Sequence, residues 1–185
     1  GDGIQSGLML YHGPEENFFM ATIQPPRRVT LAEIPPREYV FVVDVSGSMQ
    51  GFPLNTSKTL LRDLIGHLRP TETFNVLLFS GGSRLMSPSS VPATGQNIAR
   101  AVSLIDQEQG GGGTELLAAV ERAMALPGDE RSRSRSILII TDGYIGAERE
   151  VFTTIREHLG EANVFAFGIG SGVNRHLIEG LARAG

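Results

Sequence analysis

A carboxylate and two hydroxyl groups stand at alternate positions of this sequence, directly after a strongly apolar run. Residues 39–43, with the sequence YVFVV, are all β-branched or aromatic, which predicts a strand buried on both faces. Asp44 ends this run, and Ser46 and Ser48 follow it. Alternate residues on one turn can direct three oxygen atoms at a common point, and in an open α/β sheet that point lies in the crevice at the carboxyl ends of the strands. The spacing therefore indicates a loop that can chelate a cation.

Two further side chains with oxygen donors follow other predicted elements. Thr114 comes after the glycine run 110–113, and Asp142 comes after the strand-like run ILIIT at 137–141. Carboxylate and hydroxyl oxygens are hard ligands that suit Mg²⁺, Mn²⁺ or Ca²⁺ and bind soft metals poorly. The candidate metal ligands are therefore Asp44, Ser46, Ser48, Thr114 and Asp142. Only two of these side chains are charged, so a divalent cation would be at most neutralised, would keep water or an open position, and would attract a carboxylate from another molecule.

Helix capping is the alternative explanation for these side chains. Ser, Thr and Asp are common at the N-termini of helices, where each contributes about 1 kcal/mol. Capping would be the better explanation for Ser48 or Thr114 considered alone. The whole set lies in three loops and includes a D-x-S-x-S spacing, which a cap does not require, so capping explains the set less well.

Strand and helix patterns alternate from residue 37 onward. Strands are predicted at 39–43, 74–79, 137–140 and 164–169, with a short antiparallel edge strand at 84–86. Apolar stripes with helical spacing are present at 53–68, 98–105, 116–124, 151–159 and 177–181. This alternation predicts a three-layer, Rossmann-like open α/β sheet that is mostly parallel, with right-handed crossovers and helices on both faces. Because Asp44 and Asp142 must reach one ion, we expect the strands that they end to be adjacent at a switch point of the sheet.

The first 36 residues follow a different pattern. Residues 7–11 and 17–24 are strand-like and are joined by the sequence GPEE, which predicts a β-hairpin outside the centre of the main sheet. Pairs of prolines at 25–26 and 35–36 bracket an extended connector. We therefore expect an N-terminal hairpin and connector at 1–36 and the α/β domain at 37–185. The Arg- and Ser-rich stretch 129–136 is predicted to be a solvated loop.

The composition argues against several classes of protein. The 185 residues carry 16 basic and 20 acidic side chains, a net charge of −4, and so show no nucleic-acid-binding character. No apolar run approaches the roughly 20 residues of a membrane span, so no membrane insertion is expected. The chain has no cysteine, which excludes disulfides, thiolate chemistry and zinc–sulfur sites but does not define a compartment. It begins GDG, without Met or a signal peptide, and we expect it to be part of a longer protein.

The motif set resembles the metal-ion-dependent adhesion site of von Willebrand factor A domains. The matching residues are D-x-S-x-S at Asp44, Ser46 and Ser48, then Gly113-Thr114-Glu115-Leu116, then Thr141-Asp142-Gly143. The resemblance covers residues 37–185 and implies that the five candidate ligands coordinate a divalent cation, most often Mg²⁺, directly or through water. It also implies a non-enzymatic interaction or adhesion module, whose protein partner presents Asp or Glu to the metal.

A narrower resemblance is to the inter-α-trypsin inhibitor heavy-chain group. It rests on the sequences NFFM at 17–20, PP at 25–26, GIGS at 168–171 and VNR at 173–175. In bacterial members of that group a VIT domain precedes the A domain. The resemblance therefore implies a bacterial protein located outside the cytoplasm, in which residues 1–36 form the junction to a VIT-type domain absent from this chain. A-type domains usually carry a further strand and a final helix, so the domain at 37–185 is expected to stop before them.

Two other functions compete with a metal-dependent interaction module. One is a metal-free A-type domain that serves only as a scaffold, against which the complete set of oxygen donors argues. The other is an enzyme. A serine hydrolase needs G-x-S-x-G, but Asp44 occupies the position of the first glycine before Ser46. A P-loop needs a Lys after its glycines, but here Thr114 follows the glycine run directly. A phosphoryl-transfer enzyme with Asp44 as nucleophile would need a second acid at position 46, and it is the least favoured alternative.

Overall fold

The computed structural model describes residues 3–25, 34–128, 134–143, 145, 148–160 and 162–185. The chain divides into two compact units, Gly1–Pro35 and Pro36–Gly185. The predicted connector and the predicted Arg- and Ser-rich loop fall largely outside the described residues, at 26–33 and 129–133.

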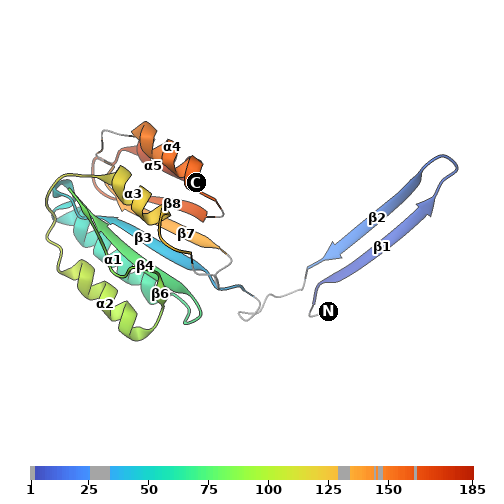
Figure 1. Ribbon diagram of the computed structural model, residues 1–185, viewed down its shortest axis with the longest axis horizontal. Helices are drawn as coiled ribbons and strands as arrows, with labels where there is room; N and C mark the ends of the chain where they lie inside the picture. Colours follow the sequence, from blue (N-terminus) through green and yellow to red (C-terminus); the bar gives the residue numbers. More distant parts are fainter. Residues whose placement is uncertain (1–2, 26–33, 129–133, 144, 146–147, 161) are drawn as a thin grey trace. The chain divides into compact units, whose positions relative to one another are not determined.

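The larger unit contains a six-stranded, mostly parallel sheet (Figure 1). Its strands are β3 (Glu38–Asp44), β4 (Thr73–Phe79), β5 (Ser83–Leu85), β6 (Val91–Pro92), β7 (Arg135–Thr141) and β8 (Ala162–Gly168). The order across the sheet is β5-β4-β3-β7-β8, and β6 also pairs with β4. β5 and β6 are antiparallel to β4, whereas the other pairs are parallel. The predicted edge strand is confirmed as β5, one residue earlier than expected, while the two-residue β6 is too short to leave an alternating pattern.

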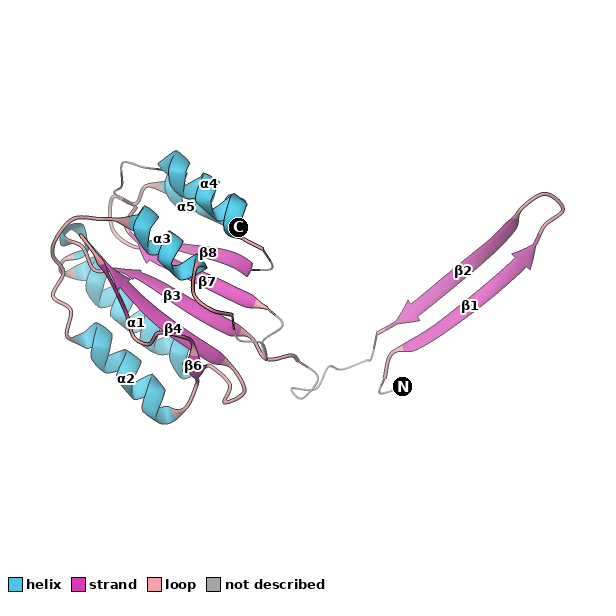
Figure 2. Ribbon diagram, viewed as in Figure 1, coloured by secondary structure: helices cyan, strands magenta, loops and turns pink. Residues whose placement is uncertain are grey.

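In the described part of this unit, five α-helices cover the two faces of the sheet, as the alternation predicts (Figure 2). They are α1 (Phe52–Gly66), α2 (Gly95–Asp106), α3 (Leu116–Met124), α4 (Glu148–His158) and α5 (Arg175–Ala184). α1 and α2 share one core cluster, and α3, α4 and α5 share the other. Side chains of β3 alternate between the two clusters, with Val40 and Val42 in one and Phe41 and Val43 in the other. The three-layer α/β fold is therefore confirmed, with β3 buried in its centre.

Local signals explain most of the helix boundaries. α1 begins with Pro53 in its first turn, where a missing N–H costs no hydrogen bond. The Thr94 side chain accepts from the N–H of Asn97 at the start of α2, and Asn174 does the same for Leu177 in α5. The apolar stripe that predicts α1 extends to residue 68, but the helix ends at Gly66. Leu68 still packs against the core from the following turn.

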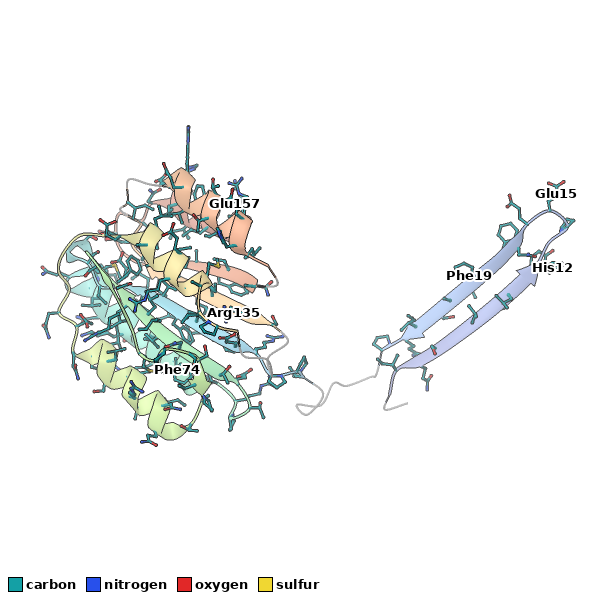
Figure 3. The ribbon with its side chains drawn as sticks, viewed as in Figure 1. His12, Glu15, Phe19, Phe74, Arg135 and Glu157 are labelled. Atoms are coloured by element: carbon teal, nitrogen blue, oxygen red, sulfur yellow. The ribbon has the colours of Figure 1, made fainter. Side chains whose placement is uncertain are left out.

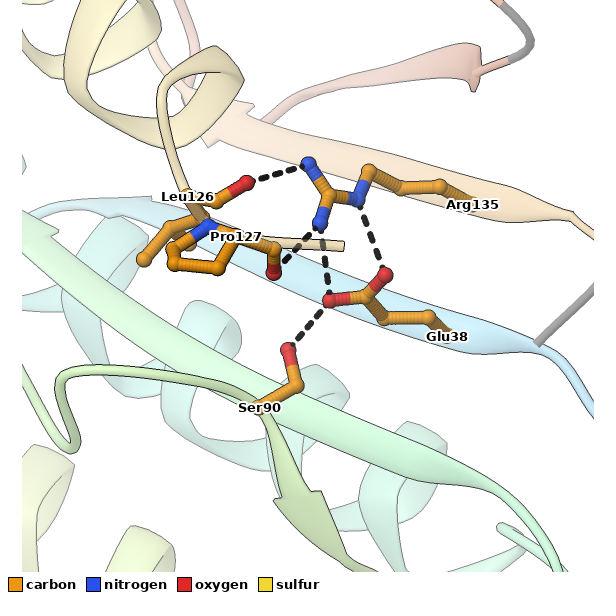
Figure 4. Close-up of polar contacts among 5 residues, drawn as sticks. All are labelled: Glu38, Ser90, Leu126, Pro127 and Arg135. Atoms are coloured by element: carbon orange, nitrogen blue, oxygen red, sulfur yellow. Dashed lines mark hydrogen bonds and ion pairs between the residues drawn. The ribbon is translucent and has the colours of Figure 1, made fainter. Parts of the chain in front are cut away.

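A buried ion pair joins the amino ends of β3 and β7, at the opposite end of the sheet from the candidate ligands (Figure 4). The Glu38 side chain is only 2% exposed, and its carboxylate accepts two hydrogen bonds from Arg135, at 2.9 and 3.1 Å. The Ser90 hydroxyl donates to the same carboxylate, and Arg135 also donates to the carbonyls of Leu126 and Pro127. The cluster thus satisfies a buried charge and links four segments of the chain.

The smaller unit is an antiparallel hairpin of β1 (Gln5–His12) and β2 (Asn17–Gln24), as predicted. It forms a two-stranded sheet of its own. Phe19 projects from β2 in Figure 3 and is 74% exposed. Large exposed apolar side chains on both faces of this unit are Ile4, Leu8, Met9, Leu10, Tyr11, Phe18, Phe19, Met20 and Ile23. A two-stranded hairpin is at best marginally stable in water, and this hairpin by itself covers neither of its apolar faces.

Candidate metal site

The two candidate carboxylates end neighbouring strands, as predicted. β3 and β7 are paired in parallel, and Val43 stands opposite Ile140, so Asp44 and Asp142 follow at the same edge of the sheet. The chain passes from β3 to β4 on one side of β3, and β7 lies on the other side. The crossover direction therefore reverses between β3 and β7, where open α/β sheets form a crevice that can hold a ligand.

Hydrogen bonds from the loop after β3 and from the end of β7 orient the Asp44 carboxylate. Its Oδ1 accepts from the backbone N–H of Ser46 at 2.9 Å, and its Oδ2 accepts from Thr141 Oγ1 at 2.6 Å. Thr141 Oγ1 in turn accepts from the N–H of Gly143 at 3.0 Å. Each carboxylate oxygen has further lone pairs, so both remain able to bind a cation. Sequence reasoning did not assign this role to Thr141, although a hydroxyl at the end of an aliphatic strand is a signal for it.

Ser46 and Ser48 bring their hydroxyls together on the first loop. Ser46 is fully buried and Ser48 is exposed, and the two Oγ atoms lie 3.2 Å apart. Ser46 precedes a short 3₁₀ turn at Gly47–Met49, yet its side chain makes no capping hydrogen bond there. Thr114 is not the N-cap of α3, because Glu115 holds that position. Capping therefore does not explain the hydroxyls of Ser46 and Thr114.

The glycine run that precedes Thr114 is held against the first loop. Gly47 donates its N–H to the carbonyl of Gly112 at 3.1 Å, and Gly111 donates to the carbonyl of Val45 at 2.9 Å. The side chain of Gln50 donates to the carbonyl of Gly110 at 3.0 Å. These bonds hold the glycine run against the loop after β3. The two segments are far apart in the sequence, since Gln50 and Gly110 are separated by 60 positions. The half-buried Thr114 follows this docked segment.

The third loop is fixed from the side of α5. Asp142 is 4% exposed, and its backbone carbonyl accepts from the N–H of Asn174 at 3.1 Å. Gly143 has φ +85°, a conformation that favours glycine, and a Cβ atom there would lie 3.0 Å from Asn174 Cβ. Asn174 also donates from Nδ2 to Glu148 at the start of α4. Asn174, which sequence reasoning used only as part of the VNR match, therefore positions the loop that carries Asp142.

Burial perturbs the ionisation of the central carboxylate. Desolvation raises the pKa of Asp44 above its ordinary value of 3.8, and the negative charge of Asp142 raises it further. The hydrogen bonds from Ser46 and Thr141 act in the opposite direction and partly offset this effect. A cation between the two carboxylates would favour the charged form of both.

The donor set fits a hard divalent cation. In an octahedral Mg²⁺ site with bonds of about 2.1 Å, adjacent oxygen ligands lie about 3 Å apart, close to the separation of the Ser46 and Ser48 hydroxyls. No group of three or more His, Cys, Asp or Glu that could hold a metal occurs among the described residues. A cation at this site would therefore depend on hydroxyl oxygens in addition to the two carboxylates.

Comparison with known proteins agrees with the topology of the larger unit. The family model for the von Willebrand factor type A domain matches residues 37–185. The chain belongs to the von Willebrand factor type A (VWA) domain family. VWA domains commonly mediate protein interactions or adhesion, generally without catalysis, and often bind a divalent metal ion. No helix in the described part of the chain is both long and apolar enough to cross a membrane.

Curated relatives and a solved structure extend the comparison. Human inter-alpha-trypsin inhibitor heavy chain H4 is 29% identical over 180 residues, which covers 91% of this chain and 19% of that protein. A von Willebrand factor A domain-containing protein of Dictyostelium discoideum is 29% identical over 148 residues, covering 80% of this chain and 16% of that protein. The structure of a von Willebrand factor type A protein from Catenulispora acidiphila has a TM-score of 0.71 at 18% identity, covering 99% of this chain and 44% of that one. The chain thus spans less than a fifth of the length of these two curated relatives.

Proposed function

We propose that this VWA domain binds a divalent cation, Mg²⁺ or alternatively Mn²⁺ or Ca²⁺, and uses it to bind an acidic side chain of a partner protein. The observation that carries the proposal is the buried Asp44 carboxylate, oriented by Ser46 and Thr141, beside the paired hydroxyls of Ser46 and Ser48. Asp44, Ser46 and Ser48 would hold the cation directly. Thr114 and Asp142 would hold it directly or through water.

The cation would act as a Lewis acid that faces the partner. If Asp142 acts through water, only Asp44 places a negative charge directly against the two positive charges of the ion. The uncompensated charge then favours a Glu or Asp side chain over a neutral oxygen ligand. The buried position of Asp44 strengthens its own attraction to the cation, because charges interact more strongly where water is excluded.

A metal titration tests cation binding. The protein is stripped with EDTA, and its melting temperature is measured against Mg²⁺, Mn²⁺ and Ca²⁺. A cation that binds only the folded state stabilises it by about 2.7 kcal/mol at 100 times the dissociation constant. A melting temperature that does not change with any of these ions would instead support the metal-free scaffold.

We propose further that residues 1–36, the hairpin and the connector, form the junction to a VIT-type domain and that the protein lies outside the cytoplasm. The exposed apolar side chains on both hairpin faces support the first point. So does the match to the inter-alpha-trypsin inhibitor heavy chain, which covers 91% of the chain against 80% for the Dictyostelium protein.

Solved structures of this fold described as a membrane protein and as pilus proteins support the proposed location outside the cytoplasm. Protease protection of the full-length protein in intact cells would contradict an extracytoplasmic location.

A further inference from the structure

Two adjoining hollows lie on the side of the VWA domain formed by β4, β5 and α2. One has a volume of about 360 Å³, and its lining includes Val45, Ser80, Arg84 and Glu108. The other has a volume of about 380 Å³, and its lining includes Arg84, Met86, Arg100 and Gln107. Arg84 lines both hollows, which together we call the β5 groove.

The β5 groove begins beside the candidate metal loops. Val45, which lies between Asp44 and Ser46, accepts a hydrogen bond from Gly111 of the glycine run. The carbonyl of Ser80 accepts from the N–H of Glu115, the residue after Thr114, at 2.8 Å. One extended segment of a partner that contacts the cation could therefore continue into the groove, with successive residues about 3.3 Å apart along it.

The lining of the groove carries an excess of positive charge. The Arg84 side chain is 54% exposed and forms an ion pair with Glu108, the acid that lines the same hollow. Arg100 donates to the carbonyl of Met86 at 2.6 Å, a neutral acceptor that does not offset its charge. Among the described residues, no acidic group lies within ion-pair distance of Arg100. This excess occurs on a chain whose net charge is −4.

We propose that the β5 groove binds an acidic, extended segment of the same partner protein, with Arg84 and Arg100 pairing with carboxylates that follow the one on the cation. This inference rests on the proposed function, because the cation and the arginines select the same sign of charge. The planar guanidinium groups can each bind a carboxylate through two parallel hydrogen bonds. The arginines thereby make the site specific for a segment with several carboxylates, because a single carboxylate would bind only the cation.

A fluorescent decaglutamate peptide is the probe, and its binding to the full chain is measured by fluorescence anisotropy in Mg²⁺ and in EDTA. We expect Arg84→Gln and Arg100→Gln each to weaken binding by about three- to tenfold. Arg100→Lys should recover part of the loss because it keeps the charge. Arg183→Gln is the matched control, since Arg183 is an exposed arginine on α5 outside the groove, and it should leave the affinity unchanged.

The outcomes separate the groove from the metal site. Arginine-dependent binding that is equal in Mg²⁺ and in EDTA would uphold the groove and contradict the proposed function. Mg²⁺-dependent binding that neither groove variant changes would overturn the groove and leave the metal proposal standing. Equal losses in Arg183→Gln and the groove variants, or no binding of the decaglutamate peptide, would also overturn it. The Mg²⁺-induced shift in melting temperature, measured on every variant, should not change in the groove variants.

Discussion

At the scale of single residues, the environment of Asp44 connects folding with cation binding. Its carboxylate is fully buried, yet it accepts hydrogen bonds from Ser46 and Thr141 and lies near a second carboxylate. The hydrogen bonds hold both oxygens in one orientation, while burial and the charge of Asp142 oppose ionisation. A bound cation would therefore favour the ionised form of Asp44, which burial and the charge of Asp142 oppose.

The variant Asp44→Asn should abolish the response to Mg²⁺ and slightly stabilise the metal-free protein. Asparagine keeps the shape of the side chain, so its Oδ1 can still accept from Ser46 and its Nδ2 can donate to Thr141 Oγ1. The variant removes the buried charge and its repulsion with Asp142. Thermal unfolding with and without Mg²⁺ measures both effects, and a wild-type Mg²⁺ shift in Asp44→Asn would remove Asp44 from the ligand set.

The raised pKa of Asp44 predicts how pH affects both states of the site. The pKa of Asp44 in the folded, metal-free protein lies above the ordinary value of 3.8. Protonated Asp44 therefore stabilises the metal-free fold at a pH below 3.8, and this contribution is lost as the pH rises through the folded-state pKa. A cation competes with the proton, so Mg²⁺ affinity should show the opposite trend and fall as the pH falls through the raised pKa. Calorimetric titrations between pH 7 and pH 4 test this, and an affinity independent of pH would contradict it.

At the scale of elements, the glycine run docks on the first loop of the candidate site and leads directly into Thr114. Gly110 has φ +80°, and a Cβ atom there would lie 2.9 Å from Gln50 Cγ and 3.3 Å from the carbonyl oxygen of Ser46. Gly111 offers a matched comparison in the same run. It has no positive φ, and a Cβ atom there would meet nothing within 4 Å.

The variant Gly110→Ala should therefore lower stability by more than about 1 kcal/mol and weaken Mg²⁺ binding, whereas Gly111→Ala should change both much less. Denaturant unfolding and the Mg²⁺ titration provide the two measurements. Equal effects of the two substitutions would show that the conformation of Gly110 is not what docks the loop.

The ion pair at the amino end of the sheet contributes to stability and lies far from the candidate ligands. Removing Arg135 would take two hydrogen bonds and a neighbouring positive charge from the buried Glu38 carboxylate, so Arg135→Ala should cost about 3 kcal/mol or more. Arg183→Ala breaks an exposed pair with Glu179 and should cost at most about 0.5 kcal/mol. Chemical denaturation compares the two variants. A Mg²⁺ affinity that is unchanged in Arg135→Ala would separate this structural role from the site.

At the scale of the whole molecule, the two units differ in how they bury apolar surface. The larger unit encloses two core clusters, one on each face of its sheet, whereas the hairpin exposes large apolar side chains on both faces. A protein of residues 36–185 should therefore keep the melting temperature and Mg²⁺ response of the full chain and aggregate less at high concentration. Light scattering and thermal unfolding test this, and a large fall in melting temperature would show that the hairpin stabilises the VWA domain.

The sequence by itself determined the fold class and the residues that end the central strands. Strands and helices leave local patterns in the sequence, such as the apolar runs at 39–43 and 137–140 and the helical stripes between them. These patterns reflect which side of each element is buried, so they could be recognised without the structure. The adjacency of β3 and β7 was also predicted, because Asp44 and Asp142 were expected to reach one ion at a switch point of the sheet.

Only the tertiary structure decided which residues support that site. Thr141 and Asp44 are 97 positions apart, as are Arg135 and Glu38, and no local pattern pairs them. The docking of Gly110 on Gln50 and the β5 groove around Arg84 likewise depend on how distant loops pack. The physical reason is that hydrogen bonds and ion pairs between distant segments form only after the sheet has fixed their positions, whereas strand and helix patterns reflect burial along the chain itself.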